Sequence, residues 1–180
     1  GVKDGIEKWA SRLMPSLIAI LILLILYVLT LPGASDGLRA YLVPDFSRIA
    51  DPVLLVNAMG QAFFSLSLGV GTMLVYGSYI SKQENLPAIG GLVALLDIGI
   101  AVMAGMLILP AMYVALGNGV EIFDADGGLI AGPGLIVSVL PALFDTMGSI
   151  GVPVAIAFFL LMTIASLTSS ISMLEVPVAY

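Results

Sequence analysis

The sequence predicts an all-α membrane protein in which one membrane helix is broken. Hydrophobic residues make up 60% of its 180 residues, charged residues make up 10%, and the mean hydropathy is +1.15. An ordinary soluble domain is only about 45–50% apolar. One apolar segment, 60–72, holds three glycines, two serines and a glutamine. Lipid offers no hydrogen-bond partners, so backbone freed there must face protein, water or a bound solute.

The composition excludes several classes of function. The chain has no His and no Cys, which removes disulfides, thiolate or imidazole metal sites and a Ser-His-Asp triad. Its six basic residues do not cluster, so we expect no nucleic-acid partner. No nucleophile and base form a recognisable pair, so we expect no enzyme. The opening residues lack the order of regions typical of a signal peptide, and we expect the chain to be a piece of a longer protein.

The first half of the chain predicts two of four membrane spans in a single transmembrane domain, 1–180. Residues 13–31 are almost purely apolar, about the 20 residues needed to cross a bilayer core. Pro15 would lie in the first turn of this span, where a missing N–H costs little. An ordered loop with one helical turn follows at 32–52. The second span, 53–79, is a poor continuous helix because each glycine costs roughly 1 kcal/mol relative to alanine.

The second half predicts the other two spans. Residues 88–116 form a long apolar segment that contains one ionisable residue, Asp97. Residues 117–150 contain an acidic loop (Glu121, Asp124 and Asp126) and an amphipathic piece, 135–147, that is too short to cross. We interpret that region as re-entrant or capping helices in an extracellular loop. The fourth span is 151–174.

The basic residues predict the orientation in the cell membrane. Four of six fall on one side of the predicted spans, namely Lys3, Lys8, Arg12 and Lys82. Arg39 and Arg48 fall on the other side, beside several acids. The positive-inside rule therefore places the N-terminal end and the 80–87 loop in the cytoplasm.

Asp97 needs a partner inside the membrane. A carboxylate in the middle of a membrane helix costs about 2.5–3.5 kcal/mol on insertion scales. It should therefore face the protein interior and either meet a cation or share a proton. A structural hydrogen bond in the protonated form is the alternative, and the cation site is the interpretation we favour.

Two further groups of polar residues occur in the spans. Ala165, Thr168 and Ser169 are spaced i, i+3 and i+4, so one carbonyl and two hydroxyls share a helix face. Uncharged hard oxygens of this kind suit Na⁺, although such hydroxyls often bond only to their own helix. Gln61 and Ser65 have the same i, i+4 relation. Small residues here could instead serve close helix packing, but packing alone would not require the amide.

These residues resemble the neurotransmitter:sodium symporter family, which includes bacterial leucine-transporter-like amino acid transporters. Segment 60–71 (GQAFFSLSLGVG) looks like the sixth transmembrane helix of that family, and 165–170 (ASLTSS) looks like the eighth. The opening 5–15 and Pro44-Asp-Phe also match, in order. The resemblance implies helices five to eight of a twelve-helix protein whose core consists of two inverted repeats. The remaining helices would complete the site.

The resemblance also implies roles for individual residues. Phe64 would close over the substrate, and Ser67 would meet its amino group through a backbone carbonyl. Val70 and Met173 would shape the side-chain pocket, with Ser169 on its wall. The first Na⁺ would be bound by Ser65 and Asp97, and the second by Ala165, Thr168 and Ser169.

Two positions depart from the family pattern. Well-known members carry Asn where this chain has Asp97, and chloride-dependent members bind Cl⁻ near the positions of Gln61, Ser65 and Asp97. We hypothesise that the Asp97 carboxylate binds Na⁺ and also supplies the negative charge of chloride, so chloride is not required. Val70 replaces a bulky aromatic residue, which favours larger hydrophobic or aromatic substrates.

The function expected is sodium-coupled symport of an amino acid across the plasma membrane by alternating access. The alternatives are an ion channel or a transporter of another broken-helix family, and a purely structural membrane subunit. Saturable, sodium-dependent uptake of an amino acid distinguishes a symporter from a channel. A structural subunit should tolerate the loss of Asp97 or Thr168.

Overall fold

The computed structural model describes residues 2–125 and 127–179, and the chain in these ranges is mostly helical. The described residues contain no strand beyond an isolated bridge between Phe123 and Leu129. The all-α fold class is therefore confirmed. Asp126 of the acidic loop lies outside the described residues, and so do the side chains of Lys3, Lys8 and Arg48, on which the predicted orientation partly depends.

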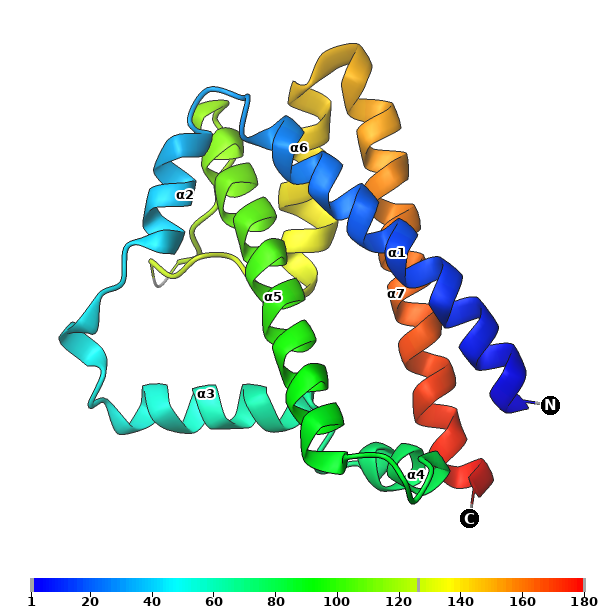
Figure 1. The fold of residues 1–180 in the computed structure, drawn as a ribbon. Coiled ribbons are helices and arrows are strands. Elements are labelled where there is room, and N and C mark those ends of the chain that lie inside the picture. The colour runs from blue at the N-terminus through cyan, green and yellow to red at the C-terminus, as the bar shows by residue number, and fades with distance from the viewer. Residues whose placement is uncertain (1, 126, 180) are drawn as a thin grey trace. The chain divides into compact units, whose positions relative to one another are not determined.

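Helices follow one another along the chain, and the longest connection is the loop 118–134 between α5 and η2 (Figure 1). The α-helices are α1 (Val2–Val28), α2 (Ala34–Leu42), α3 (Pro52–Ser65), α4 (Thr72–Tyr79), α5 (Leu86–Gly117), α6 (Leu140–Thr146) and α7 (Gly151–Ala179). Two short 3₁₀ turns, η1 (Phe46–Arg48) and η3 (Gly148–Ile150), and a π-helical turn, η2 (Leu135–Val139), complete the order.

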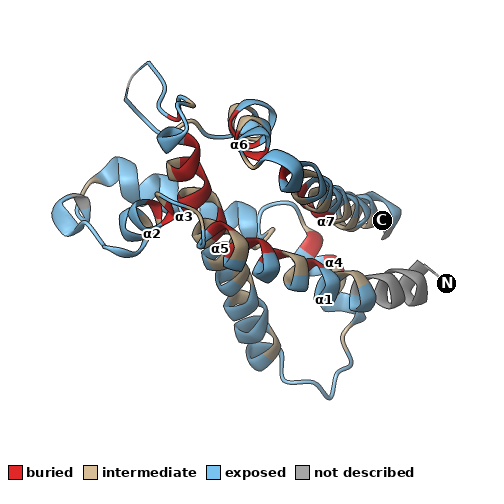
Figure 2. Cartoon of the chain, turned by 90° about the horizontal axis from the view of Figure 1, so that it is seen from above, coloured by how far each residue is buried: buried red, intermediate tan, exposed pale blue. Residues whose placement is uncertain are grey.

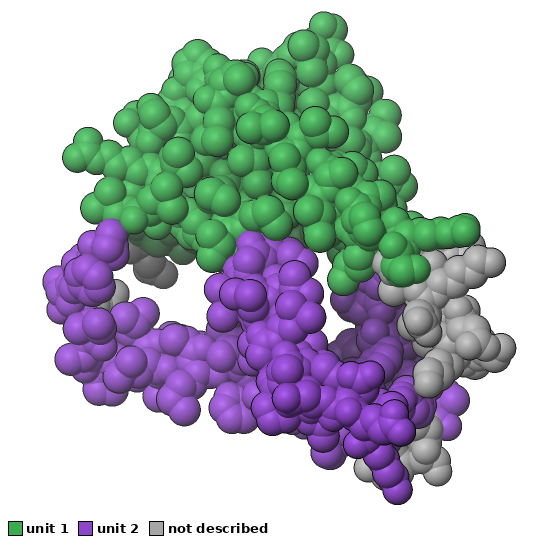
Figure 3. All heavy atoms as spheres, in the orientation of Figure 1, with its two compact units in different colours: residues 1–43, 102–165 green, residues 44–101, 166–180 purple. Residues whose placement is uncertain are grey.

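The chain divides into two compact units, coloured separately in Figure 3. Unit 1 comprises residues 1–43 and 102–165, and unit 2 comprises residues 44–101 and 166–180. Helices α5 and α7 each contribute one part to either unit.

Unit 1 contains an apolar core, shown in red in Figure 2. Leu17, Leu21, Leu24 and Val28 recur along α1 at the spacing of one helix face and are buried. They belong to the same cluster as buried residues of α5, of α6 and of the first half of α7. Because residues from four helices share this core, packing fixes the arrangement of unit 1.

Glycine permits close backbone contact between α2 and α5 in unit 1. A Cβ atom added at Gly37 would lie 2.6 Å from the carbonyl oxygen of Leu109 and 2.6 Å from Cα of Pro110. Likewise, the ring of Tyr41 on α2 occupies the space where a Cβ of Gly105 on α5 would lie. Small residues at helix contacts are the usual means of bringing membrane helices close together.

Unit 2 contains the broken helix. Helix α3 ends at Ser65 and α4 begins at Thr72, so the expected break is present. Gly60, which we expected to weaken the helix, lies inside an uninterrupted α3. Gly71 has φ 82° and precedes the first residue of α4. The first residue with positive φ after α3 is Ser67, the second residue beyond the helix, and not Gly69.

Three helical segments are long and apolar enough to cross a membrane, namely Ser11–Val28, Leu86–Gly117 and Gly148–Val178. Two expectations about the first 52 residues were wrong. Helix α1 begins at Val2, so Pro15 lies inside the helix and not in its first turn. Helix α2 has nine residues where we expected a single turn. Its Asp36 near the start and Arg39 near the end complement the helix dipole.

Candidate functional site

The C-terminal end of α3 is a Schellman motif with a serine in the left-handed position. The N–H of Leu68 donates to the carbonyl of Phe63 at 3.0 Å, and the N–H of Ser67 donates to the carbonyl of Phe64 at 3.0 Å. Glycine usually occupies this position, but here Ser67 adopts φ 54°. A non-glycine residue in this conformation stores strain of a kind that clusters at functional sites.

This helix end leaves backbone acceptors available. Within the described residues, the carbonyl groups of Ser65 and Ser67 accept no hydrogen bond. In an aqueous loop such groups would bond to water, but at membrane depth an unpaired carbonyl costs several kcal/mol unless it finds another partner. The carbonyl oxygens of Ser65 and Ser67 are therefore available to a ligand at the break.

Ser65 and Asp97 are brought together by the structure. Ser65 Oγ lies 2.8 Å from Oδ1 and 2.9 Å from Oδ2 of Asp97, to which it donates. Ser65 is the last residue of α3, and Asp97 lies about a third of the way along α5. A hydroxyl that donates its proton keeps two lone pairs. The pair thus presents carboxyl oxygens and a hydroxyl oxygen at the break.

The predicted oxygen ligands of the second Na⁺ lie on α7. Ala165, Thr168 and Ser169 occur within one uninterrupted stretch of this helix, so their i, i+3 and i+4 spacing is preserved. Thr168 is half-buried and Ser169 is exposed. Neither Ser65 nor Asp97 bonds to α7 in the part of the chain that is described.

The predicted substrate residues flank the break and follow the α7 oxygens. Phe64 precedes the last residue of α3 and is 73% exposed, and Val70 lies in the segment between α3 and α4 and is 49% exposed. Met173 lies one turn after Ser169 on α7 and is 54% exposed. Gln61, expected near the chloride site, lies one turn before Ser65. The structure places these residues on their elements without joining them into one pocket.

A set of polar contacts that the sequence did not predict joins α4 to the C-terminal part of α7, and Figure 1 shows these two segments beside each other. The hydroxyl of Tyr76 donates to Ser172 Oγ at 3.2 Å, and the hydroxyl of Tyr79 donates to Glu175 Oε1 at 2.7 Å. The two tyrosine rings pack edge to face, with centroids 6.2 Å apart. Equal i, i+3 spacing on both helices was the available signal.

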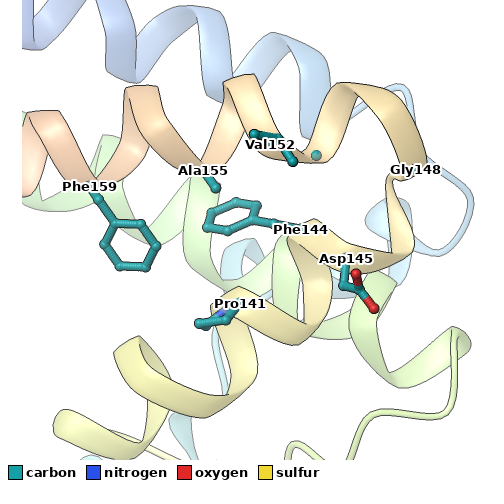
Figure 4. Close-up of a pocket in the computed structure, with 8 residues that line it drawn as sticks. Pro141, Phe144, Asp145, Gly148, Val152, Ala155 and Phe159 are labelled. Atoms are coloured by element: carbon teal, nitrogen blue, oxygen red, sulfur yellow. The ribbon is translucent and has the colours of Figure 1, made fainter.

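A separate pocket lies in unit 1 between α6 and the first turns of α7. Its volume is about 230 Å³, and its lining is mainly apolar, including Phe144, Val152 and Phe159, with Asp145 at one side (Figure 4). The rings of Phe144 and Phe159 meet edge to face with centroids 6.0 Å apart. None of the predicted site residues lines this pocket.

Comparison with known proteins shows which family this chain is similar to. The family model described as the sodium:neurotransmitter symporter family matches residues 1–180. The chain is 40% identical over 176 residues to an uncharacterized sodium-dependent transporter of Haemophilus influenzae, an alignment that covers 98% of this chain and 36% of the relative. It is 38% identical over 179 residues to an uncharacterized sodium-dependent transporter of Bacillus subtilis. That alignment covers 99% of this chain and 37% of the relative.

Similarity extends to animal proteins. The chain is 34% identical over 152 residues to a sodium- and chloride-dependent taurine transporter of Canis lupus familiaris, with 84% of this chain and 24% of the relative covered. The chain spans little more than a third of the length of the two bacterial relatives. Because the family model matches its full length, the chain belongs to the sodium:neurotransmitter symporter family.

Proposed function

We propose that this chain is part of a sodium-coupled symporter that carries an amino acid across the plasma membrane by alternating access. The observation that carries the proposal is the contact between Ser65 Oγ and Asp97, 2.8 and 2.9 Å long, at the end of the broken helix. It brings a carboxylate and a hydroxyl together at the end of α3, and the carbonyls of Ser65 and Ser67 that follow accept no hydrogen bond within the described residues. Family membership supports transport rather than enzyme chemistry.

The donor set suits a monovalent cation. In the described residues no group of three or more Asp, Glu, His or Cys side chains comes together, whereas calcium sites bring together several carboxylates. A single carboxylate with neutral oxygens carries one negative charge, which matches one Na⁺. We therefore assign the first Na⁺ to Ser65 and Asp97, and the second Na⁺ to Ala165, Thr168 and Ser169 on α7.

Sodium entry can drive substrate transport because each Na⁺ carries a charge across the membrane together with the substrate. Each Na⁺ that enters down a membrane potential contributes about 2.3 kcal/mol per 100 mV. Only ions that bind differently to the outward-open and inward-open states can convert this energy into accumulation of substrate. The break between α3 and α4 supplies a segment whose order depends on what its carbonyls bind.

We further propose that transport does not require chloride, because Asp97 provides the negative charge itself. The names of the two bacterial relatives mention sodium alone, whereas that of the taurine transporter mentions sodium and chloride. The side chain of Val70 is small, which leaves room for a bulky hydrophobic or aromatic substrate. The N-terminal end and the 80–87 loop would face the cytoplasm.

Uptake into proteoliposomes that contain the full-length transporter tests these proposals. A panel of radiolabelled amino acids should show saturable uptake that requires a Na⁺ gradient and persists when gluconate replaces chloride. In Asp97→Asn, uptake should become chloride-dependent while remaining sodium-dependent. A strict chloride requirement in the parent protein would refute the role of Asp97 in replacing chloride, and uptake without sodium would refute symport.

A further inference from the structure

We propose that Tyr76 and Ser172 are positioning residues for the second sodium site, acting through the backbone of Thr168. This inference rests on the proposed function, since it concerns the ligands assigned to that ion. It adds to that function a link between α4, which follows the break, and the oxygen-bearing turn of α7.

Three groups in unit 2 form a continuous chain of hydrogen bonds. The hydroxyl of Tyr76 donates to Ser172 Oγ at 3.2 Å, and Ser172 Oγ donates to the carbonyl of Thr168 at 3.1 Å. All three residues are half-buried in the structure. Ser172 therefore accepts from one helix and donates to its own helix with the same oxygen atom.

The bond to Thr168 acts on the turn that carries the sodium ligands. A serine that donates to the carbonyl four residues earlier adds a second donor to that carbonyl and often bends its helix. On its own, the Ser172 hydroxyl could rotate to another acceptor. The bond from Tyr76 favours the rotamer that engages Thr168, and bonds in such a chain polarise one another.

Tyr76 itself is held in place by its own helix. Its ring packs against Tyr79, whose hydroxyl bonds to Glu175 one turn further along α7. Val176 Cγ1 would lie 3.7 Å from a Cβ atom added at Gly71, directly before α4. Helix α4 therefore contacts α7 at several points, and a change in the order of the break can reach Thr168 through Ser172.

Ser170 offers an internal comparison. Ser170 Oγ donates to the carbonyl of Ser166 at 2.8 Å, the same bond to the preceding turn that Ser172 makes. In the described residues it has no partner on α4. Loss of the Ser170 hydroxyl thus removes a serine from α7 without touching the proposed link.

The test measures the dependence of uptake on Na⁺ in the full-length transporter, at saturating amino acid and equal amounts of reconstituted protein. Tyr76→Phe keeps the ring and removes the hydroxyl, and Ser172→Ala removes the central oxygen. Each change should raise the half-saturating Na⁺ concentration roughly two- to tenfold, the range for loss of one neutral hydrogen bond. The KM for amino acid at saturating Na⁺ should stay the same.

Matched variants distinguish positioning from a general loss of structure. Ser172→Thr keeps a hydroxyl and should restore the parental sodium dependence, while Ser170→Ala should leave it unchanged. The double variant Tyr76→Phe/Ser172→Ala should shift the sodium dependence no further than the larger single change, because both act through one chain.

Two results would overturn the inference. The first is an unchanged half-saturating Na⁺ concentration in both single variants, and the second is shifts that multiply in the double variant. The sodium requirement of Thr168→Ala shows whether such a result contradicts only the positioning role or also the proposed second sodium site. If Thr168→Ala raises the sodium requirement while the Tyr76 and Ser172 variants do not, the second sodium site stands and the positioning role is wrong.

Discussion

Unit 1 and unit 2 differ in what holds each of them together. Apart from Val75, every buried hydrophobic side chain in the described residues belongs to unit 1. The side chain-to-side chain hydrogen bonds of Ser65 with Asp97, of Tyr76 with Ser172 and of Tyr79 with Glu175 all lie in unit 2. One unit depends on packing, and the other depends on a few polar contacts.

This difference suggests a division of labour. Helices in a membrane associate through close packing and through hydrogen bonds between helices. Packing is insensitive to ions, whereas polar groups near a break respond to whatever they bind. Changes in unit 1 should therefore reduce the amount of folded protein, and changes in unit 2 should alter transport in protein that remains folded.

Removing the Asp97 carboxylate should produce the largest effect on transport. Asp97→Ala removes the charged partner of Ser65 and, in our proposal, a ligand of the first Na⁺. Loss of a hydrogen bond to a charged group costs about 1.5–3 kcal/mol, so uptake should fall about 10- to 100-fold. Sodium-dependent uptake and the melting temperature in detergent should be measured on the same preparation.

A second acid provides the control for this change. Asp145 on α6 belongs to unit 1 and is exposed, so Asp145→Ala should leave uptake within about twofold of the parent. If Asp97→Ala instead lowers the melting temperature while the remaining folded protein transports normally, Asp97 has a structural role, and the contrast between the units does not hold.

Overpacking a glycine contact should produce the largest effect on stability. Gly37→Ala would place a Cβ atom 2.6 Å from the backbone of α5 in unit 1. Such overpacking costs about 1–3 kcal/mol, so the melting temperature and the yield of folded protein should fall. The half-saturating Na⁺ concentration of the protein that folds should match that of the parent.

Gly117→Ala is the matched control, because a Cβ atom at this position has no neighbour within 4 Å. Its effect on stability should be small. Equal destabilisation by the two changes would mean that the contact between α2 and α5 is not what fixes this part of unit 1.

The sequence predicts the class of fold and the place of the break well, because both depend on local chemistry. Apolar segments of membrane length and the cluster of small and polar residues at 60–72 are visible without any packing information. The sequence did not predict the exact backbone geometry of the break. Ser67 takes the left-handed conformation although two glycines lie nearby, because the Schellman bonds to Phe63 and Phe64 fix its position.

The equal i, i+3 spacing of polar residues on α4 and α7 does not by itself show that these two distant helices pack together. Tyr76 and Ser172 are 96 residues apart, as are Tyr79 and Glu175. The fourth span was expected to end at 174, before Glu175, and only the packing of α4 on α7 makes these residues partners. Ser65 and Asp97, 32 residues apart, were associated in advance only through the family resemblance.

A change in the size of residue 70 should alter substrate preference within unit 2. Val70→Phe adds a ring to one wall of the proposed substrate pocket, so affinity should shift from bulky toward smaller hydrophobic amino acids. A size mismatch of this kind is worth about 1–3 kcal/mol, or a change of about tenfold in the ratio of kcat/KM values. Competition between labelled amino acids of different size measures this ratio.

Val70→Ile is the conservative control for this experiment and should change the ratio much less. If Val70→Phe lowers uptake of all amino acids by the same factor, residue 70 affects transport without contacting the substrate side chain. The assignment of the pocket wall would then be wrong, although sodium coupling would be unaffected.

The bond between Tyr79 and Glu175 should give the smallest effect, which makes it a sharp test of the contrast between the units. Tyr79→Phe removes the 2.7 Å hydrogen bond but keeps the ring that packs on Tyr76. Because the bond is exposed, water can replace it, and the melting temperature should fall by about 2 °C or less. Tyr79→Leu also removes the ring and should have a greater effect. If Tyr79→Phe destabilises the protein as much as Gly37→Ala, polar contacts hold unit 2 as firmly as packing holds unit 1, and the two units do not differ in the way proposed.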